Sequence, residues 1–410
     1  MIIKRGNNML HLFTFFYIFG FKIYSIIDST ILVGMILTVK IIINKELAVI
    51  FKRKITNKYS FKIFIAYLCL LMVAGIACAI GNAYDFSYIK TLIHLGIVVI
   101  IGYELASLYE YKGKSSKILN YIIVAFLIQT IFQWICYIFP TFSSYFNYFR
   151  SSSMVEKSVH YNGYRGIALS QSGFFALSAS YALVILLYFS KNNSLTKNTF
   201  LKYILFGVLL SGTFFAGRTG YIGLLMIPFL LYVNHEKNGI IIRFDVLKKI
   251  LVSLICIGIF LALISYMSNN KRLAGLYNFT FELFNNYESG LGFRSTSTDR
   301  LLEMYDVDIS AKTFIFGDGQ YSTEDGHYYG GSDVGYIRKI LYFGIFGLIA
   351  SLIFQIVLMN KDIKTKEGKI VLLLLLILEL KGEIIGLNIM INSCLILYTL
   401  CTDKFDENRI

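Results

Sequence analysis

Hydrophobic residues occur in long runs from one end of the chain to the other, and short polar stretches separate the runs. A run of about 20 apolar residues is long enough to cross a lipid bilayer as a helix. The pattern therefore predicts an all-α, polytopic integral membrane protein. The expected helices, about twelve, lie near residues 9–27, 30–44, 63–81, 91–109, 118–139, 167–189, 203–216, 220–233, 250–267, 334–359, 370–386 and 388–402.

Two polar stretches are longer than the others, residues 140–165 and 268–332. The second contains several Arg and Asp residues and the sequence GDG, and it continues directly into the apolar run at 334–359. Ionisable side chains are expensive inside lipid and cheap at its edge, so a membrane protein can keep its chemistry in such a stretch. We interpret residues 1–410 as a single transmembrane bundle that carries two larger loops.

Lys and Arg are concentrated in several of the shorter polar breaks, such as 45–62, 110–117 and 234–249. The cytoplasmic loops of membrane proteins carry an excess of these residues. The breaks therefore predict the cytoplasmic side, with both termini inside. The same orientation places the two larger loops outside.

The composition agrees with a membrane protein, because 56% of the residues are hydrophobic and only 16% are charged. The net charge of +14 comes largely from the basic turns, so it reflects membrane orientation and does not indicate nucleic-acid binding. The six cysteines form no CxxC pair, and no P-loop or Rossmann fingerprint occurs. We expect neither a metal nor another cofactor.

Several arginines lie on the predicted outer side, which is unusual for a membrane protein whose Lys and Arg residues are concentrated in its cytoplasmic loops. A guanidinium can hold a phosphate or a carboxylate through two hydrogen bonds and stays charged at any working pH. Several that converge would suit a lipid-linked diphosphate, whereas each alone could pair with a carboxylate or reach lipid headgroups. The outer arginines are Arg150, Arg165 at a helix start, Arg218 in a tight turn between glycines, Arg294 and Arg300.

The end of the larger loop holds candidate acid–base and stacking residues. His327 and Asp333 lie next to the return into the membrane, where either could activate a sugar hydroxyl as a base. Tyr328 and Tyr336 could stack on sugar rings, or they could belong to the aromatic belt of a membrane interface.

Charged residues also interrupt the leucine-rich predicted helix 370–386. Charges inside a membrane normally face the protein interior and pair. At a helical offset of four, Glu379 and Glu383 should share a face, while Lys381 should find a partner on another helix. We expect a polar cavity beneath the outer loops, with Glu383 as a candidate substrate-binding residue.

Two stretches carry a resemblance to a known family: YRGIALSQSGFF with SGTFFAGRTGYIGLL, and R-x16-GDG followed by SDVGYIRKILYFGIFGLIAS. Together they resemble the bacterial O-antigen polymerase (Wzy) family, which is grouped with the O-antigen ligases. The topology of about twelve helices with two larger loops resembles that family over most of the chain, and the motifs cover about 160–222 and 294–350.

The resemblance implies a GT-C-like membrane glycosyltransferase in the bacterial inner membrane, with its active site facing the periplasm. Such an enzyme transfers a growing glycan from undecaprenyl diphosphate to the terminal sugar of a lipid-linked repeat unit. The arginines that neutralise the departing diphosphate would be Arg165 and Arg300, with Arg218 in support. A flippase and a chain-length regulator of the same pathway are the implied protein partners.

Two alternatives stay open. An O-antigen ligase is the nearest, and His327 could match the histidine that ligases use, but Asp333 stands where a ligase would have its His-containing helix start. A flippase or other transporter of lipid-linked oligosaccharides is the alternative from another class. It should carry ionisable residues within several helices, whereas most unusual charges here lie in predicted outer loops.

We expect Arg300→Ala, in the native host, to collapse a long ladder of surface glycan to material capped by a single repeat. The reason is that the departing diphosphate would lose a neutralising charge. A gel of the surface glycan measures the result. Loss of all capped material would indicate a ligase or flippase, and an unchanged ladder would remove Arg300 from the mechanism.

Overall fold

The computed structural model describes residues 5–23, 27–81, 84–152, 154–156, 168–235, 278, 282, 285–292 and 294–402. Over these residues the chain consists of helices and connecting loops, apart from one antiparallel pair of two-residue strands. The strands are β1 (Lys22–Ile23) and β2 (Ile27–Asp28), with Ile23 opposite Ile27. The predicted all-α class is therefore correct for the described part of the chain.

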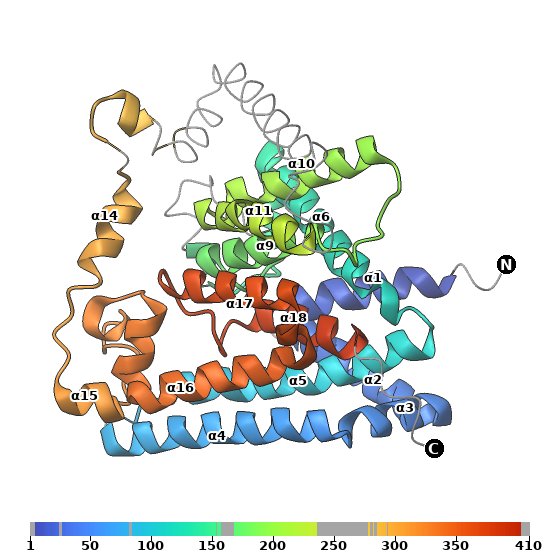
Figure 1. Cartoon of the computed structure of the whole chain (residues 1–410), viewed down its shortest axis with the longest axis horizontal. Helices are drawn as coiled ribbons and strands as arrows, with labels where there is room; N and C mark the ends of the chain where they lie inside the picture. Colours follow the sequence, from blue (N-terminus) through green and yellow to red (C-terminus); the bar gives the residue numbers. More distant parts are fainter. Residues whose placement is uncertain are drawn as a thin grey trace. The chain divides into compact units, whose positions relative to one another are not determined.

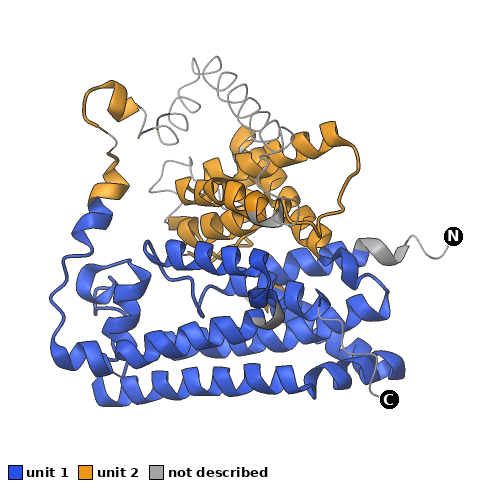
Figure 2. Ribbon diagram, in the orientation of Figure 1, with its two compact units in different colours: residues 1–18, 30–118, 300–410 blue, residues 19–29, 119–299 orange. Residues whose placement is uncertain are grey.

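The chain divides into two compact units, coloured separately in Figure 2. Unit 1 comprises residues 1–18, 30–118 and 300–410, and unit 2 comprises residues 19–29 and 119–299. Residues from the two ends of the sequence thus fold together in unit 1.

In unit 1, the long helices α4 (Lys58–Gly81) and α16 (Gly335–Lys364) pack side by side, and α5 (Ser87–Tyr111) packs against both α4 and α18 (Ile389–Thr402) (Figure 1). The other helices of this unit are α1 (Arg5–Phe19), α2 (Ser29–Ile43), α3 (Lys45–Ile55), η1 (Ser115–Lys117), α15 (Ala311–Phe316), η5 (Tyr329–Gly331) and α17 (Lys366–Glu379).

Unit 2 is built around α9 (Phe174–Tyr188), which packs against α10 (Thr199–Ala216) and α11 (Tyr221–His235). Aromatic side chains fill its core, including Trp134 against Phe215. The remaining helices are α6 (Ile118–Ile138), α7 (Pro140–Asn147) and η2 (Arg218–Gly220), and α14 (Thr296–Glu303) crosses the boundary between the units.

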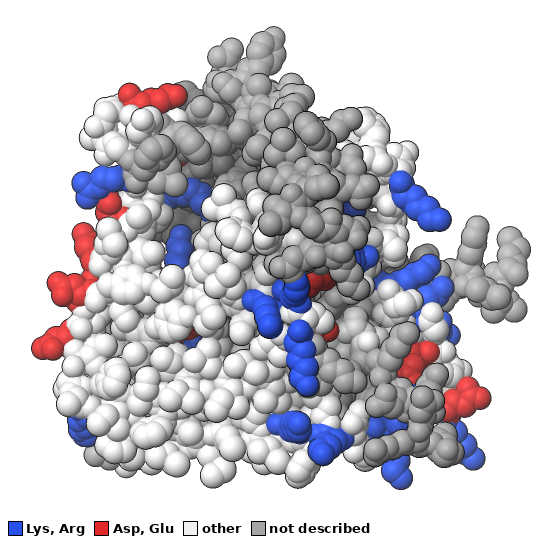
Figure 3. Space-filling model, in the orientation of Figure 1, with Lys and Arg blue, Asp and Glu red and all other residues white. Residues whose placement is uncertain are grey.

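Five described helices are long and apolar enough to cross a membrane: Lys58–Gly81, Ser87–Tyr111, Ser115–Ile138, Thr199–Ala216 and Gly335–Met359. Large apolar side chains such as Phe61 and Met72 are exposed on α4. Figure 3 shows a broad uncharged surface where α4 lies, bordered by Lys and Arg at the end where α3 lies. These features fit an all-α membrane protein; the full count of twelve spans stays a prediction, and the predicted helix 250–267 lies outside the described residues.

Some predicted boundaries are wrong, for local reasons. The helix predicted at 9–27 ends at Phe19, because Gly20 adopts a left-handed conformation (φ +49°) and the β1–β2 hairpin follows. The basic stretch 45–62 is largely helical, since the Asn44 side chain accepts a hydrogen bond from Leu47 N and caps α3.

The GDG sequence at 317–319 is a wedge between α4 and α16. Gly317 and Gly319 have φ of +74° and +63°, which L residues rarely adopt. Asp318 N donates to Leu341 O (2.7 Å) and Gly319 N donates to Tyr342 O (3.1 Å), so the wedge uses carbonyl groups of α16. A Cβ on Gly319 would overlap the backbone of α4 at Ala77. Only glycine fits this close approach.

Gly319→Ala should therefore lower the free energy of unfolding by about 2–4 kcal/mol, from backbone strain plus overlap with α4. Gly326→Ala is the matched control, because Gly326 has a similar φ of +76° but open space around its Cβ position. The control should cost only about 1–2 kcal/mol of strain. Thermal unfolding of the purified variants measures both, and equal losses would contradict the wedge.

Candidate functional site

Three loops far apart in the sequence meet at one end of unit 1. They are the α4–α5 loop, the segment 317–334 before α16, and the α17–α18 loop at 380–388. Asp85 Oδ2, in the first loop, accepts hydrogen bonds from Tyr321 N (2.8 Å) and Ser322 N (3.0 Å). Tyr321 Oη donates to Glu383 Oε2 (2.9 Å) in the third loop. The second of them lies largely within residues 268–332, which the sequence predicts to be outside, whereas residues 380–386 were expected within the helix 370–386.

Residues 321–329 form a short hairpin in the second loop. Tyr329 N donates to Tyr321 O and Thr323 N donates to His327 O, with Ser322 paired to Tyr328. The turn is closed at Gly326, whose left-handed backbone suits glycine. The hairpin brings the rings of Tyr321 and Tyr328 to 5.9 Å from each other, centroid to centroid.

Both rings lie against Arg338, in the first turn of α16. The guanidinium carbon is 4.0 Å from the centroid of Tyr321 and 3.5 Å from that of Tyr328, which is cation–π geometry. Arg338 Nε lies 3.0 Å from Glu383 Oε2, and Arg338 is only 5% exposed. We call Tyr321, Tyr328, Arg338 and Glu383 the Arg338 cluster.

The Arg338 cluster has unused hydrogen-bonding capacity. Nη1 and Nη2 of Arg338 make no hydrogen bond of good geometry to any described residue, and neither does Glu383 Oε1. Buried polar groups are normally satisfied, because an unmet donor or acceptor costs about 1–3 kcal/mol and more when charged. Two donors and one acceptor are thus available together for a polar ligand.

The next residue of α16, Lys339, forms an ion pair with Glu379, and both side chains are fully buried. Glu379 Oε2 also accepts hydrogen bonds from Ile384 N (2.8 Å) and Ile385 N (2.7 Å). This carboxylate therefore fixes the loop that carries Glu383.

These contacts correct one expectation and confirm another. Glu379 and Glu383 do not share a helix face, because α17 ends at Glu379 and its carboxylate captures the amides that follow. The general expectation that charges in this stretch pair is confirmed for Glu379, whose partner Lys339 belongs to α16, whereas the partner on another helix had been expected for Lys381.

The other candidates of unit 1 lie around the Arg338 cluster or apart from it. His327 is exposed in the hairpin, and Asp333 is exposed just before α16, where its charge acts on Tyr321. Tyr336 donates to Leu376 O (3.0 Å), an anchoring contact between α16 and α17. Arg300 is exposed on α14.

The arginines of unit 2 have local partners. Arg218 donates to Glu282 Oε2 (2.7 Å) and Ser297 Oγ (2.9 Å). Arg294 pairs with Asp299. Arg150 is buried and donates to Ala168 O (2.8 Å) and Asn147 Oδ1 (3.1 Å). Carboxylate pairing, one of the two readings of these arginines, thus applies to Arg218 and Arg294.

Arg165 lies outside the described residues, and Arg218 and Arg300 belong to different units. Their convergence on one anion stays a prediction.

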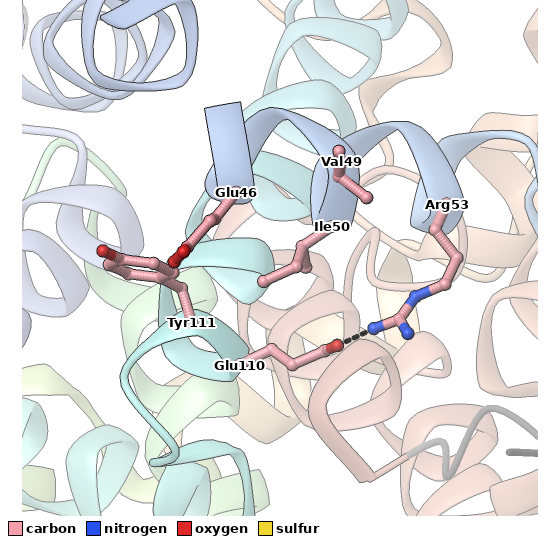
Figure 4. A pocket seen from close by; sticks show the side chains of 6 residues that line it. All are labelled: Glu46, Val49, Ile50, Arg53, Glu110 and Tyr111. Atoms are coloured by element: carbon pink, nitrogen blue, oxygen red, sulfur yellow. Dashed lines mark hydrogen bonds and ion pairs between the residues drawn. The ribbon is translucent and has the colours of Figure 1, made fainter. Parts of the chain in front are cut away.

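A hollow between α3 and α5 is the other candidate, shown in Figure 4. It is lined by Glu46, Val49, Ile50, Arg53, Glu110 and Tyr111. Glu110 already pairs with Arg53 and with Lys54 (2.8 Å). Because Glu110 is already paired with two cations, the hollow offers less chemistry than the Arg338 cluster.

In the part of the chain that the structure describes, no group of three His, Cys, Asp or Glu side chains is placed so that it could hold a metal ion.

The site residues predicted from the sequence do not include Arg338, Lys339 or Asp85. A signal for the first two was present, since adjacent basic residues in the apolar run GYIRKILYFG require buried partners. Asp85 had no such signal, because an acidic residue in a short loop is usually solvated.

Comparison with known proteins identifies no relative. No family model, no curated protein and no solved structure matches the chain.

Asp85 offers a pH-dependent test of how the loops are joined. Its burial opposes ionisation, but hydrogen bonds from Ser87, Ser322 and Tyr321 outweigh burial and hold the pKa of this carboxyl below its usual value. Its carboxylate therefore stabilises the fold above the unfolded pKa of about 3.9, and this contribution is lost as the pH falls through the lower folded pKa.

We expect Asp85→Asn to lower the melting temperature of the purified protein at about pH 7, because the variant loses the charge that these donors favour. The difference from the wild type should shrink toward about pH 3. Asp325→Asn, at the exposed tip of the hairpin, is the control and should leave the melting temperature unchanged. A deficit that is the same at both pH values would contradict this account.

Proposed function

We propose that the protein is a membrane glycosyltransferase that polymerises lipid-linked repeat units of a bacterial polysaccharide. The observation that carries the proposal is the Arg338 cluster, in which buried, unsatisfied polar groups lie beside two tyrosine rings. Hydrogen-bonding groups next to aromatic faces are what a sugar ring requires of a binding site. The resemblance to O-antigen polymerases in the stretch that contains Arg338 supports the same reading.

The proposed enzyme has about twelve spans in the inner membrane and works on its periplasmic side. Its donor is a glycan on undecaprenyl diphosphate, and its acceptor is the terminal sugar of a second lipid-linked unit. The acceptor hydroxyl oxygen attacks the donor's anomeric carbon, the bond from that carbon to the diphosphate oxygen breaks, and the hydroxyl proton passes to a base. Arg165, Arg218 and Arg300 are proposed to neutralise the diphosphate.

Three carboxyl or imidazole groups are available as the base. Glu383 has a free carboxylate oxygen beside the guanidinium, while Asp333 and His327 are exposed nearby in the same unit. We favour Glu383, because it already sits in the cluster with an unused acceptor atom and its loop is fixed by Glu379. Asp333 and His327 are the alternatives.

Glu383→Gln should collapse the ladder of surface glycan in the native host to a single added repeat, since an amide cannot take the hydroxyl proton. Arg338→Lys should have a similar effect, because lysine keeps the charge but loses the planar fork of donors. A gel of the surface glycan measures chain length, and an immunoblot of the membrane fraction shows that each variant is present.

Glu303→Gln, which changes an exposed carboxylate on α14, is the matched control and should leave the ladder intact. An intact ladder in Glu383→Gln would exclude Glu383 as the base. Loss of all capped material, with the variants present in the membrane, would favour the ligase or flippase over the polymerase.

A further inference from the structure

The unpartnered atoms of the Arg338 cluster form a specific pattern. Two guanidinium nitrogens of Arg338 are buried donors without a hydrogen-bond partner among the described residues, and one buried oxygen of Glu383 is an unused acceptor. The opposing partner, Glu383 Oε2, is already occupied by Arg338 Nε and Tyr321 Oη. A ligand must therefore accept two hydrogen bonds and donate one.

The charges of this region disfavour an anion. Arg338 is balanced by Glu383, and Lys339 is balanced by Glu379. Asp333 adds a further negative charge that acts on Tyr321, beside the guanidinium. A phosphate or carboxylate on Nη1 and Nη2 would have to share the guanidinium with Glu383, which already holds Arg338 Nε, so its net gain would be small.

An uncharged sugar ring meets the same pattern without that repulsion. Two neighbouring hydroxyl oxygens can accept from Nη1 and Nη2, and a hydroxyl proton can be donated to Glu383 Oε1. The C–H face of the sugar ring can stack on a tyrosine ring. A tyrosine side chain offers a large contact area and loses little conformational entropy on binding. We infer that the Arg338 cluster is a binding site for an uncharged sugar, in contrast to the diphosphate-binding role expected of the outer arginines.

Tyr328 controls access to this site. It is the most exposed member of the cluster, at 41%, and its ring covers the guanidinium at 3.5 Å. A turn of this side chain to another rotamer uncovers Nη1 and Nη2, and an exposed side chain makes such turns rapidly. The displaced ring can then stack on the incoming sugar.

Resting on the proposed polymerase function, the inference also places one substrate. The sugar held here is the acceptor, because its hydroxyl would lie against the carboxylate proposed as the base. The sugar that each repeat unit presents to the cluster is therefore uncharged.

Saturation-transfer difference NMR on the purified full chain in phosphatidylcholine nanodiscs tests the binding without requiring polymerisation. The uncharged probes are glucose, galactose, rhamnose and N-acetylglucosamine, and the anionic probes are glucuronate and inorganic pyrophosphate. We expect saturation transfer to at least one uncharged sugar, with no displacement by a tenfold excess of either anion. Glu383→Gln and Tyr328→Ala should each reduce the signal at least fivefold.

Tyr145→Ala, an exposed tyrosine of α7, and Glu303→Gln are matched controls that should keep the full signal. Size-exclusion elution identical to the wild type shows that the Tyr328→Ala variant is folded. Absence of transfer to all four uncharged sugars would overturn the inference. So would displacement by glucuronate or pyrophosphate that Arg338→Lys abolishes.

The two proposals fail in different ways. If the uncharged sugar binds but Glu383→Gln keeps an intact ladder, the Arg338 cluster is a sugar-binding site and Glu383 is not the base of the polymerase. If Glu383→Gln collapses the ladder but no uncharged sugar binds, the proposed polymerase function is kept and the assignment of the Arg338 cluster to an uncharged sugar is rejected.

Discussion

The fully buried ion pair between Lys339 and Glu379 is the interaction on which this end of unit 1 depends. Two charges withdrawn from water are tolerated only when each has good partners, and removal of one partner from such a pair costs about 3–5 kcal/mol. Glu379 meets this demand by also accepting the amides of Ile384 and Ile385. The pair therefore fixes the loop 380–388 against α16, and with it the position of Glu383.

The GDG wedge performs the corresponding task for the large polar loop. It enters between α4 and α16 and donates backbone hydrogen bonds to carbonyl groups of α16, so the hairpin that follows begins from a fixed point. Asp85 then holds the hairpin by its backbone at Tyr321 and Ser322. Arg338 is thus approached by two independently anchored loops, and binding groups held in advance lose little entropy when a ligand arrives.

The sequence located most helices but could not settle the site. Apolar runs gave the positions of α4, α5, α6 and α16 to within a few residues, because a run of hydrophobic residues is a local signal. The end of α17 was misplaced by several residues. Its boundary is set by the side chain of Glu379, which accepts hydrogen bonds from the backbone amides of Ile384 and Ile385, and a hydropathy pattern carries no trace of that contact.

By itself, the sequence determined that this is an all-α chain with membrane-compatible helices, that residues 268–332 form its longest polar interruption, and that the charges within residues 370–386 need partners. Only the tertiary structure decided which residues meet: Arg338 with Glu383, Lys339 with Glu379, and Asp85 with the hairpin. The physical reason is that apolar periodicity is written in neighbouring residues, whereas the pairing of buried charges depends on which helices pack together.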